Sequence, residues 1–176
     1  MTSPFTHVVN VRTLPRKGRD ERREANETER EAIARHLDVP AVERAVFAAE
    51  VLPWKRDGIR IAGHLDVELT QACVVSLEPV PAHIDEPFEA LLVPEGSRLA
   101  APREPTVEMT LDAEGEDAPE TFSGDTIDLA ETWLEFLTLA LDPFPRAPGA
   151  ELSVDDGAAK PSPFAALAAL KVANDP

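Results

Sequence analysis

Hydrophobic and polar residues alternate almost without a break over residues 59–73. Because the side chains of a β-strand point alternately to opposite faces, this pattern predicts one long, half-buried strand of an antiparallel sheet. Strands usually run for about 5 to 6 residues, so we expect this one to curl, with a bend or bulge at Gly63. The inner face is expected to carry Ile59, Ile61, Gly63, Leu65, Val67, Leu69, Gln71 and Cys73, with Gln71 as its single polar member.

Further strands are predicted on both sides of this one. Residues 44–54 are rich in Val, Phe and Leu, and the polar turn at residues 55–58, which ends in Asp-Gly, predicts a hairpin into the long strand. Residues 83–93 predict the next strand, in which Pro87 favours an edge position or two shorter pieces. Two more short strands are expected at residues 5–11 and 106–111.

Two helices are predicted from apolar spacing and from the residues at their ends. Thr28 and Glu31 have the spacing of a capping box, which predicts a helix over residues 29–37. Asp128 is a good N-cap for a second helix from Leu129. This second helix has a wide apolar stripe, so we expect it to pack on the sheet.

The second helix has a clear end and is followed by a short apolar segment. Asp142 and Pro143 end the helix, because a residue that precedes proline disfavours the helical conformation. Residues 162–171 predict a short C-terminal helix that would be unstable alone in water. Its apolar residues Phe164, Leu167 and Leu170 are expected to dock, either on the same chain or in a groove of a partner.

The predicted fold is therefore α+β. We expect a strongly curved antiparallel sheet or partial barrel packed against one main C-terminal helix, with a short N-terminal helix and a docking C-terminal segment. Residues 1–150 are expected to form a single domain, and residues 151–176 a linker and the C-terminal helix. Within the domain, we expect residues 12–25 to form a basic connector and residues 94–120 a partly mobile acidic loop.

Composition narrows the functional classes. The chain has 176 residues, a formal net charge of −16 and a pI near 4.5. This charge argues against a bulk surface that binds DNA or RNA and favours basic partners, although acidity can also serve solubility alone. The single cysteine excludes an internal disulfide, and no apolar run reaches the roughly 20 residues of a membrane span. We expect a soluble, cytoplasmic protein without membrane contact.

The charge is unevenly distributed along the chain. Residues 84–120 contain eleven acids and two cations. Residues 12–23 contain two acids and six cations, which are Arg12, Arg16, Lys17, Arg19, Arg22 and Arg23. Two interpretations of the basic segment are open: limited contact with RNA phosphates, or solvated charge on a loop.

Residues typical of catalytic and metal sites do not form recognisable patterns. The four histidines, at positions 7, 36, 64 and 83, have no paired spacing for a metal. No pair of carboxylates, nucleophile with a neighbouring base, or glycine-rich phosphate loop is evident. Cys73 shares the apolar face of the long strand, which favours a buried core thiol. We therefore expect no enzymatic activity, no metal and no cofactor.

Three blocks of sequence resemble the YceD-like family of bacterial large ribosomal RNA subunit accumulation proteins, with the alphaproteobacterial branch most similar. The blocks are QACVVSLEPV at 71–80, IDLAETWLEFLTLALDPFPRAPGAEL at 127–152 and PSPFAALAALK at 161–171. The residues that carry the resemblance are Gln71, Cys73, Leu77, Glu78, Pro79, Asp128, Leu129, Asp142 and Pro143.

The resemblance implies a non-enzymatic accessory factor in ribosome biogenesis that supports large-subunit ribosomal RNA. Two hypotheses for its partners follow from the charge pattern. The acidic surface of residues 84–120 would hold a basic large-subunit ribosomal protein, or the protein would sit among ribosomal proteins of a pre-ribosomal particle while residues 12–23 make limited contact with ribosomal RNA. Many relatives have a Cys-x-x-Cys pair where this chain has Cys73 and Ser76, so a metal or dithiol site is not expected here. The alternative is a generic protein interaction module that docks through its C-terminal helix.

Overall fold

The computed structural model describes residues 3–100 and 119–151. The expected strand at 106–111, most of the acidic loop at 94–120 and the C-terminal segment with Phe164, Leu167 and Leu170 lie outside the described residues. The described strands are β1 (Val8–Asn10), β2 (Arg19–Glu24), β3 (Ala41–Trp54), β4 (Gly58–Ala72), β5 (Pro79–Pro94), β6 (Glu120–Phe122) and β7 (Thr126–Asp128). The described helices are the 3-10 turn η1 (Val11–Thr13) and the α-helices α1 (Glu27–Leu37) and α2 (Leu129–Ala140).

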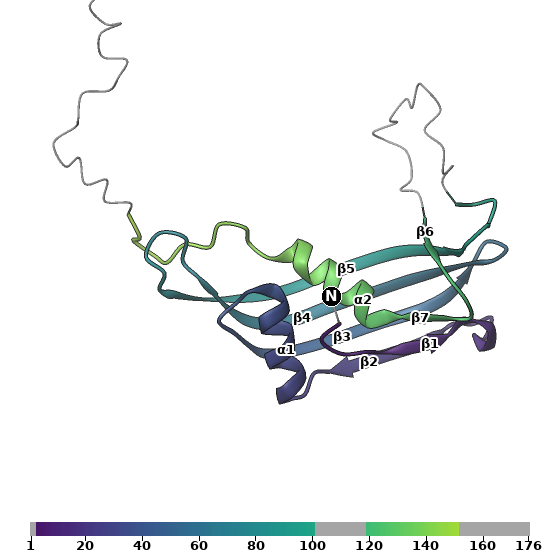
Figure 1. The fold of residues 1–176 in the computed structure, drawn as a ribbon, viewed down its shortest axis with the longest axis horizontal. Coiled ribbons are helices and arrows are strands. Elements are labelled where there is room, and N and C mark those ends of the chain that lie inside the picture. The colour runs from purple at the N-terminus through teal and green to yellow at the C-terminus, as the bar shows by residue number, and fades with distance from the viewer. Residues whose placement is uncertain (1–2, 101–118, 152–176) are drawn as a thin grey trace, which may run out of the picture.

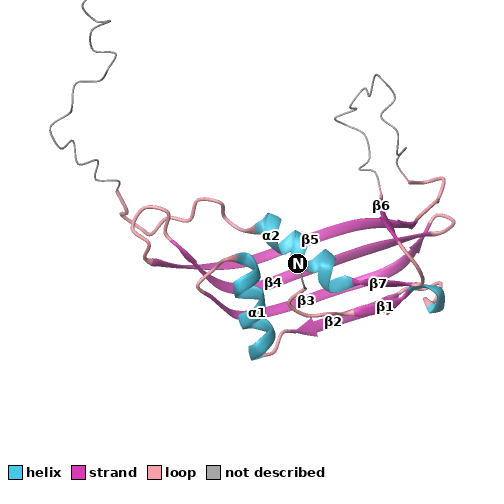
Figure 2. Cartoon of the chain, in the orientation of Figure 1, coloured by secondary structure: helices cyan, strands magenta, loops and turns pink. Residues whose placement is uncertain are grey.

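Five strands form one mixed sheet in the order β2-β3-β4-β5-β6, in which only β5 and β6 pair in parallel. The predicted hairpin is confirmed, because Trp54 pairs with Gly58 across the turn between β3 and β4. Strands β1 and β7 form a separate antiparallel pair that joins the N-terminus to the start of α2. Figure 2 shows α1 and α2 lying over the same face of the sheet. The α+β class is therefore confirmed, with two covering helices instead of one.

The core lies between this face and the helices. The predicted inner row of β4 is buried, and Ile61, Val67 and Cys73 have no exposed surface. Trp133 of α2 is also fully buried and stacks on Phe47 of β3 with ring centroids 5.4 Å apart. The amphipathic pattern of α2 therefore faces the sheet, as expected. Asp128 caps this helix by accepting a hydrogen bond from the Ala130 N–H at 3.0 Å.

The prediction of a strongly curved sheet or partial barrel is wrong. The sheet is neither closed nor strongly curled, because β4 pairs in continuous register with β5 and Gly63 forms no bulge. The register shift lies in β3 instead, between Val42 and Arg44. Position 63 requires glycine for a different reason. A Cβ there would lie 2.3 Å from the Ala48 carbonyl oxygen and 2.5 Å from the Phe88 ring.

The expectation of a basic connector over residues 12–25 is also partly wrong. Its second half is β2, which pairs with β3 over six residues and forms the edge of the sheet. All six residues of β2 are charged, three basic and three acidic, so the segment lacks the apolar positions that usually identify a strand.

The start of α1 differs from the prediction by two residues. The capping box is formed by Asn26 and Glu29, with the Glu29 N–H donating to Asn26 Oδ1 at 3.0 Å. The Asn26 N–H in turn donates to the Glu29 carboxylate at 2.9 Å. Thr28 and Glu31 have the same spacing but lie inside the helix. Asparagine accepts this bond as well as threonine does, so both pairs satisfied the sequence criterion.

Pro87 occupies an edge, as predicted. It pairs with His64 of β4 on one side. Among the residues that the structure describes, β5 has a neighbour on its other side only at Leu92–Pro94, through β6. A residue without an N–H is tolerated there, since no ladder hydrogen bond is lost.

Candidate functional site

Two of the blocks singled out in the sequence meet at one end of the sheet. We call this region the signature end: the turn of residues 73–78 between β4 and β5, together with residues 141–151 that follow α2. Figure 1 shows both segments at the end of the sheet away from the turn between β3 and β4. The Val74 N–H donates to the Pro145 carbonyl oxygen at 2.9 Å, which joins the two segments directly.

Gln71 is the second link between the two segments. It was the single polar residue of the predicted inner row, and it is buried with 7% of its surface exposed. Its amide nitrogen Nε2 donates a 2.9 Å hydrogen bond to the carbonyl oxygen of Asp142. This bond satisfies a backbone carbonyl just beyond the end of α2, where helix geometry leaves acceptors unpaired. Gln71 therefore fixes the exit of α2 against the end of β4.

The Cys73 thiol lies at the centre of the signature end. It is fully buried, as the apolar register of β4 predicted. Its sulfur accepts hydrogen bonds from the backbone N–H groups of Ala147 at 3.3 Å, Val75 at 3.4 Å and Ser76 at 3.4 Å. The bond from Ala147 is the largest cause that lowers the pKa of the thiol to about 6, and those from Ser76 follow. These hydrogen bonds favour the deprotonated form of the thiol, and they join both segments through its sulfur.

This sulfur has no neighbours that would complete a metal site. A tetrahedral site needs four ligands, and no group of three or more His, Cys, Asp or Glu side chains gathers anywhere in residues 3–100 and 119–151. Ser76, which stands at the second position of the Cys-x-x-Ser motif, donates its hydroxyl to Glu78 at 3.2 Å. The turn is therefore built by backbone hydrogen bonds between Cys73 and Glu78 and between Leu77 and Cys73, together with those to the sulfur.

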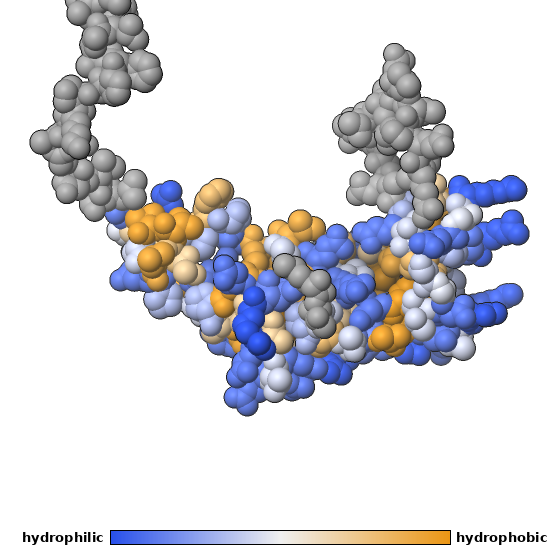
Figure 3. Space-filling model, viewed as in Figure 1, coloured by the Kyte–Doolittle hydropathy of each residue, from blue (hydrophilic) through white to orange (hydrophobic). Residues whose placement is uncertain are grey.

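Large apolar side chains are exposed on the same end. Leu77 has 77% of its surface exposed, Phe144 71% and Val74 46%. Figure 3 shows hydrophobic side chains gathered on this end of the molecule. Leu77 also has a backbone φ of +62°, in the left-handed region that leucine rarely adopts. An exposed leucine in a strained conformation contributes little to the core, so an interaction outside the chain is the better explanation for it.

A cleft opens beside these side chains, between the end of α1 and the exit of α2. It has a volume of roughly 520 Å³, and its apolar lining includes Val39, Val74 and Leu141. Asp38 and Asp142 lie on its rim. Glu78 of the turn adds a third carboxylate to the signature end. An apolar surface with an acidic rim can bind a basic protein segment that carries apolar anchors.

The remaining signature residues lie at two places. Pro79 begins β5 directly after the turn, and Pro143 lines the cleft. Asp128 and Leu129 lie at the opposite end of α2, where the Asp128 carboxylate accepts the His7 N–H at 2.7 Å. The Leu129 N–H donates to the His7 carbonyl oxygen at 3.0 Å. These two residues hold β1 against α2 and lie away from the signature end.

The six cations of the N-terminal segment do not act as one group. Arg12 pairs with Asp125 at 3.1 Å, Arg19 with Glu21, and Arg23 with Glu29. Arg16, Lys17 and Arg22 are exposed and form no ion pair with a described acid. Half of the predicted phosphate-binding set is therefore already neutralised within the fold.

The histidines form separate structural contacts. His64 pairs with Asp85, and His83 with Asp66 at 3.1 Å. The hydrogen bond from Arg44 lowers the pKa of Asp66, and the bond from His83 adds to this effect. His7 contacts Glu21 at 2.9 Å. The His64–Asp85 and His83–Asp66 pairs lie side by side across β4 and β5, because Asp66 is the cross-strand partner of Asp85, whereas His7 pairs with Glu21 of β2.

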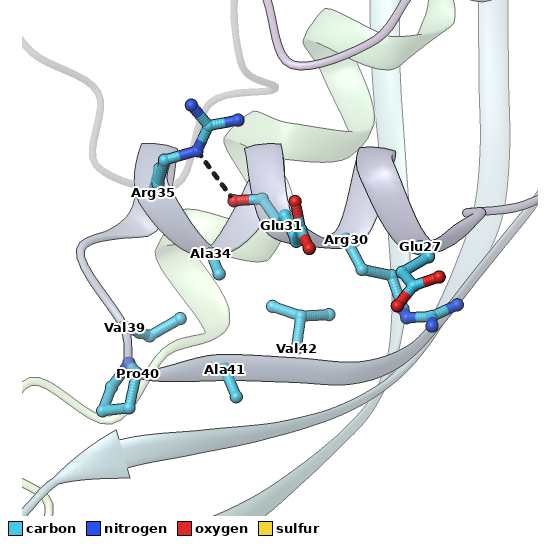
Figure 4. Close-up of a pocket in the computed structure, with 9 residues that line it drawn as sticks. All are labelled: Glu27, Arg30, Glu31, Ala34, Arg35, Val39, Pro40, Ala41 and Val42. Carbon is cyan, nitrogen blue, oxygen red and sulfur yellow. Dashed lines mark hydrogen bonds between the residues drawn. The ribbon is translucent and has the colours of Figure 1, made fainter.

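A second hollow lies between α1 and the start of β3 (Figure 4). Ala34, Val39 and Val42 line it, while Arg30 and Glu31 lie at its border. The Arg35 Nε donates to the Glu31 carbonyl oxygen at 3.2 Å, so this guanidinium is held by its own helix. Catalysis by acid and base needs two groups held across a cleft. This hollow has no such pair facing its apolar floor.

Several residues of the signature end were missed in the sequence. Val74, Phe144 and Ala147 show no local pattern, because their roles arise only when the turn and the segment after α2 come together. The run of prolines after Pro143 was the one signal that this segment has a fixed path.

Comparisons with known proteins give one match. A family model described as "Large ribosomal RNA subunit accumulation protein YceD" matches residues 61–171. No curated protein and no solved structure matches the chain. No helix in the described part of the chain is long and apolar enough to cross a membrane.

Proposed function

The chain belongs to the YceD family of large ribosomal RNA subunit accumulation proteins, and from this membership we propose that it binds a basic large-subunit ribosomal protein at its signature end. The family name supports a role in the accumulation of large-subunit ribosomal RNA and describes no reaction. Binding a basic protein before its assembly would keep that protein available for the RNA. The chain would thus act as an accessory factor and not as an enzyme.

The observation that carries this proposal is the exposed, strained Leu77 beside the acidic cleft. Leu77, Val74 and Phe144 supply apolar contact area, and Asp38, Glu78 and Asp142 supply negative charge around it. Carboxylates around an apolar centre favour partners of the opposite sign and increase their association rate, and Arg146 is the single cation among residues 73–78 and 141–151. Ribosomal proteins that bind RNA are rich in Lys and Arg, so their surfaces complement this end.

The net charge of −16 supports the same kind of partner. Most of the surface repels a polyanion and attracts a polycation, so a basic protein meets a favourable field from many directions. The family match includes both segments of the signature end, since it runs from residue 61 to residue 171. The site and the family assignment therefore rest on the same part of the chain.

The test is binding of the purified full chain to purified basic large-subunit ribosomal proteins, with an acidic protein as a negative control. We expect binding that weakens as salt rises, because exposed charges are screened beyond about 10 Å at 0.1 M salt. The variant Leu77→Asn should bind at least about tenfold more weakly, which corresponds to the loss of about 1.4 kcal/mol. Asparagine is chosen because it tolerates the left-handed backbone of this position.

A matched pair of valines controls for loss of apolar surface. Val74 at the signature end is 46% exposed, and Val8 of β1 is 58% exposed. Val74→Asn should weaken binding, and Val8→Asn should leave it unchanged. Equal effects of the two substitutions, or no preference over the acidic protein, would remove the proposal.

A further variant tests the C-terminal segment, whose docking stays a prediction. Deletion of residues 161–176 removes Phe164, Leu167 and Leu170. If this segment occupies the cleft of its own chain, the deletion should strengthen partner binding at the signature end. If it is itself the handle for a different partner, binding to basic ribosomal proteins should not change.

A further inference from the structure

The end of the sheet opposite the signature end carries a local positive charge. Two turns meet there: residues 15–18, which precede β2, and residues 55–57, between β3 and β4. The cations at this end, which we call the basic tip, are Arg16, Lys17, Lys55, Arg56 and Arg98. All five are exposed. Figure 3 shows long hydrophilic side chains projecting from this end of the molecule.

The packing of the two turns brings these cations together. The Gly18 N–H donates to the Pro15 carbonyl oxygen at 2.9 Å, which places Arg16 and Lys17 at the apex of a tight turn. Gly18 lies against the end of β3, since a Cβ on it would be 2.6 Å from the Leu52 side chain. Neighbouring strands are about 4.8 Å apart. The two turns, each with two exposed cations, therefore lie at the ends of neighbouring strands.

These cations differ from most others in the described structure because their charges are not neutralised. Arg12, Arg19, Arg23, Arg44 and Arg60 are paired with acids. Arg16, Lys17, Arg56 and Arg98 form no ion pair with any described acid. Asp57 lies on the second turn, and Glu95 lies in the segment after β5 that carries Arg98.

An aromatic ring lies within the basic tip. Trp54, at the end of β3, is partly exposed, and the Lys55 ammonium lies 4.0 Å from its ring centroid. A ring beside several cations provides a stacking surface for a base together with contacts for the flanking phosphates. An acidic peptide would use the cations, but its carboxylates have no group that stacks on the ring. The combination therefore favours a nucleic acid over an acidic protein.

We propose that the basic tip binds the phosphate backbone of single-stranded RNA, with Trp54 stacking on a base. Four of its five cations, Arg16, Lys17, Lys55 and Arg56, lie before residue 61, outside the part of the chain that matches the family. The proposal thus concerns this chain's own residues and does not rest on the protein-binding role of the signature end. A molecule with both sites would hold a basic protein at one end and RNA at the other.

The experiment measures binding of the full chain to a labelled single-stranded RNA of mixed sequence over a range of salt concentrations. The full chain is needed because residues 101–118, which lie between the described Ala100 and Pro119, add six acids and Arg103. The test variant is Arg16→Gln/Lys17→Gln/Arg56→Gln. The control is Arg22→Gln/Arg35→Gln/Arg146→Gln, which removes three exposed cations elsewhere and changes the net charge equally.

The two triple variants give opposite expectations. Each phosphate contact on a single strand contributes about 0.7 to the slope of log affinity against log salt. The tip variant should lower this slope by about 2 and weaken binding about tenfold or more at low salt, while the control should bind as the unchanged chain does. Equal weakening by both variants would overturn the proposal, because net charge alone would then explain binding.

Two further arms identify the ligand. Trp54→Ala should weaken binding to RNA severalfold, with the salt slope unchanged, because stacking does not release counterions. Polyglutamate should bind at least about tenfold more weakly than RNA. Equal binding of polyglutamate, an unchanged affinity of Trp54→Ala, or absence of RNA binding at low salt would each overturn the proposal.

Discussion

Substitution of Trp133 by alanine tests the packing on which the fold depends. Trp133 has no exposed surface, stacks on Phe47 at 5.4 Å and lies 6.5 Å from the Phe5 ring. A buried tryptophan removes about 150 to 250 Å² from water, which corresponds to roughly 4 to 6 kcal/mol at about 25 cal/mol per Å².

Two corrections change this figure. The indole Nε1 is buried without a hydrogen-bond partner, so its removal returns about 1 to 3 kcal/mol. The loss of ring stacking on Phe47 costs about 0.5 to 1.5 kcal/mol. The expected net loss is about 3 to 4 kcal/mol of unfolding free energy, within the range of about 3 to 5 kcal/mol typical of tryptophan truncation.

The assay is urea unfolding followed by far-ultraviolet circular dichroism. With a slope of about 1 to 3 kcal/mol per molar urea, the midpoint should fall by about 1 to 4 M. Trp133→Phe keeps an aromatic ring and removes the unpaired N–H, so it should cost less than about 2 kcal/mol. Trp54→Phe changes the partly exposed tryptophan and should cost less than about 1 kcal/mol. A loss below about 1 kcal/mol for Trp133→Ala would refute the packing described for α2.

Three other substitutions test local features. Gly63→Ala should destabilise the fold by about 2 to 3 kcal/mol, because its Cβ would meet the Ala48 carbonyl and the Phe88 ring. Gly96→Ala, in open space with a φ of +83°, should cost only about 1 kcal/mol, and equal urea midpoints for the two variants would contradict this. In the same assay, Asn26→Ala should cost about 1 kcal/mol and Thr28→Ala less than about 0.5 kcal/mol. The reverse order would contradict the capping box of Asn26 and Glu29 and support the predicted one of Thr28 and Glu31. The pKa of Cys73 is lowered to about 6, so the unfolding free energy should rise with pH from about 6 to about 8.5, where the unfolded thiol still holds its proton and the folded one does not. In Cys73→Ser this rise should be absent, and a wild-type curve parallel to that of the variant would exclude a folded-state thiolate.

The sequence predicted those parts of the fold in which one segment determines its own structure. The alternation in β4, the Asp-Gly turn after β3 and the boundaries of α2 each depend on neighbouring residues, and all three are confirmed. Strand β2 was missed because its side chains are charged on both faces, so its pairing depends on β3. The prediction of a strongly curved sheet was wrong because the sequence does not distinguish a glycine that makes room for Phe88 from a glycine that forms a bulge.

The candidate site was predictable only in part. Gln71, Cys73 and Leu77 were identified by resemblance. The contacts of Gln71 with Asp142 and of Cys73 with Ala147, however, require two segments about 70 residues apart to meet. The basic tip shows the same limit. Lys55 and Arg56 were interpreted only as turn residues, and their proximity to Arg16 and Lys17 follows from the pairing of β2 with β3.

The central claim is that the signature end carries the contribution of this protein to large-subunit ribosomal RNA. The most direct measurement is the ratio of large- to small-subunit ribosomal RNA in cells that lack the protein and are supplied with Leu77→Asn or with Val8→Asn. Both variants should accumulate to the level of the unchanged protein, because each changes an exposed side chain. We predict that Val8→Asn restores the ratio and Leu77→Asn does not. Full restoration by Leu77→Asn at equal protein level would contradict the account.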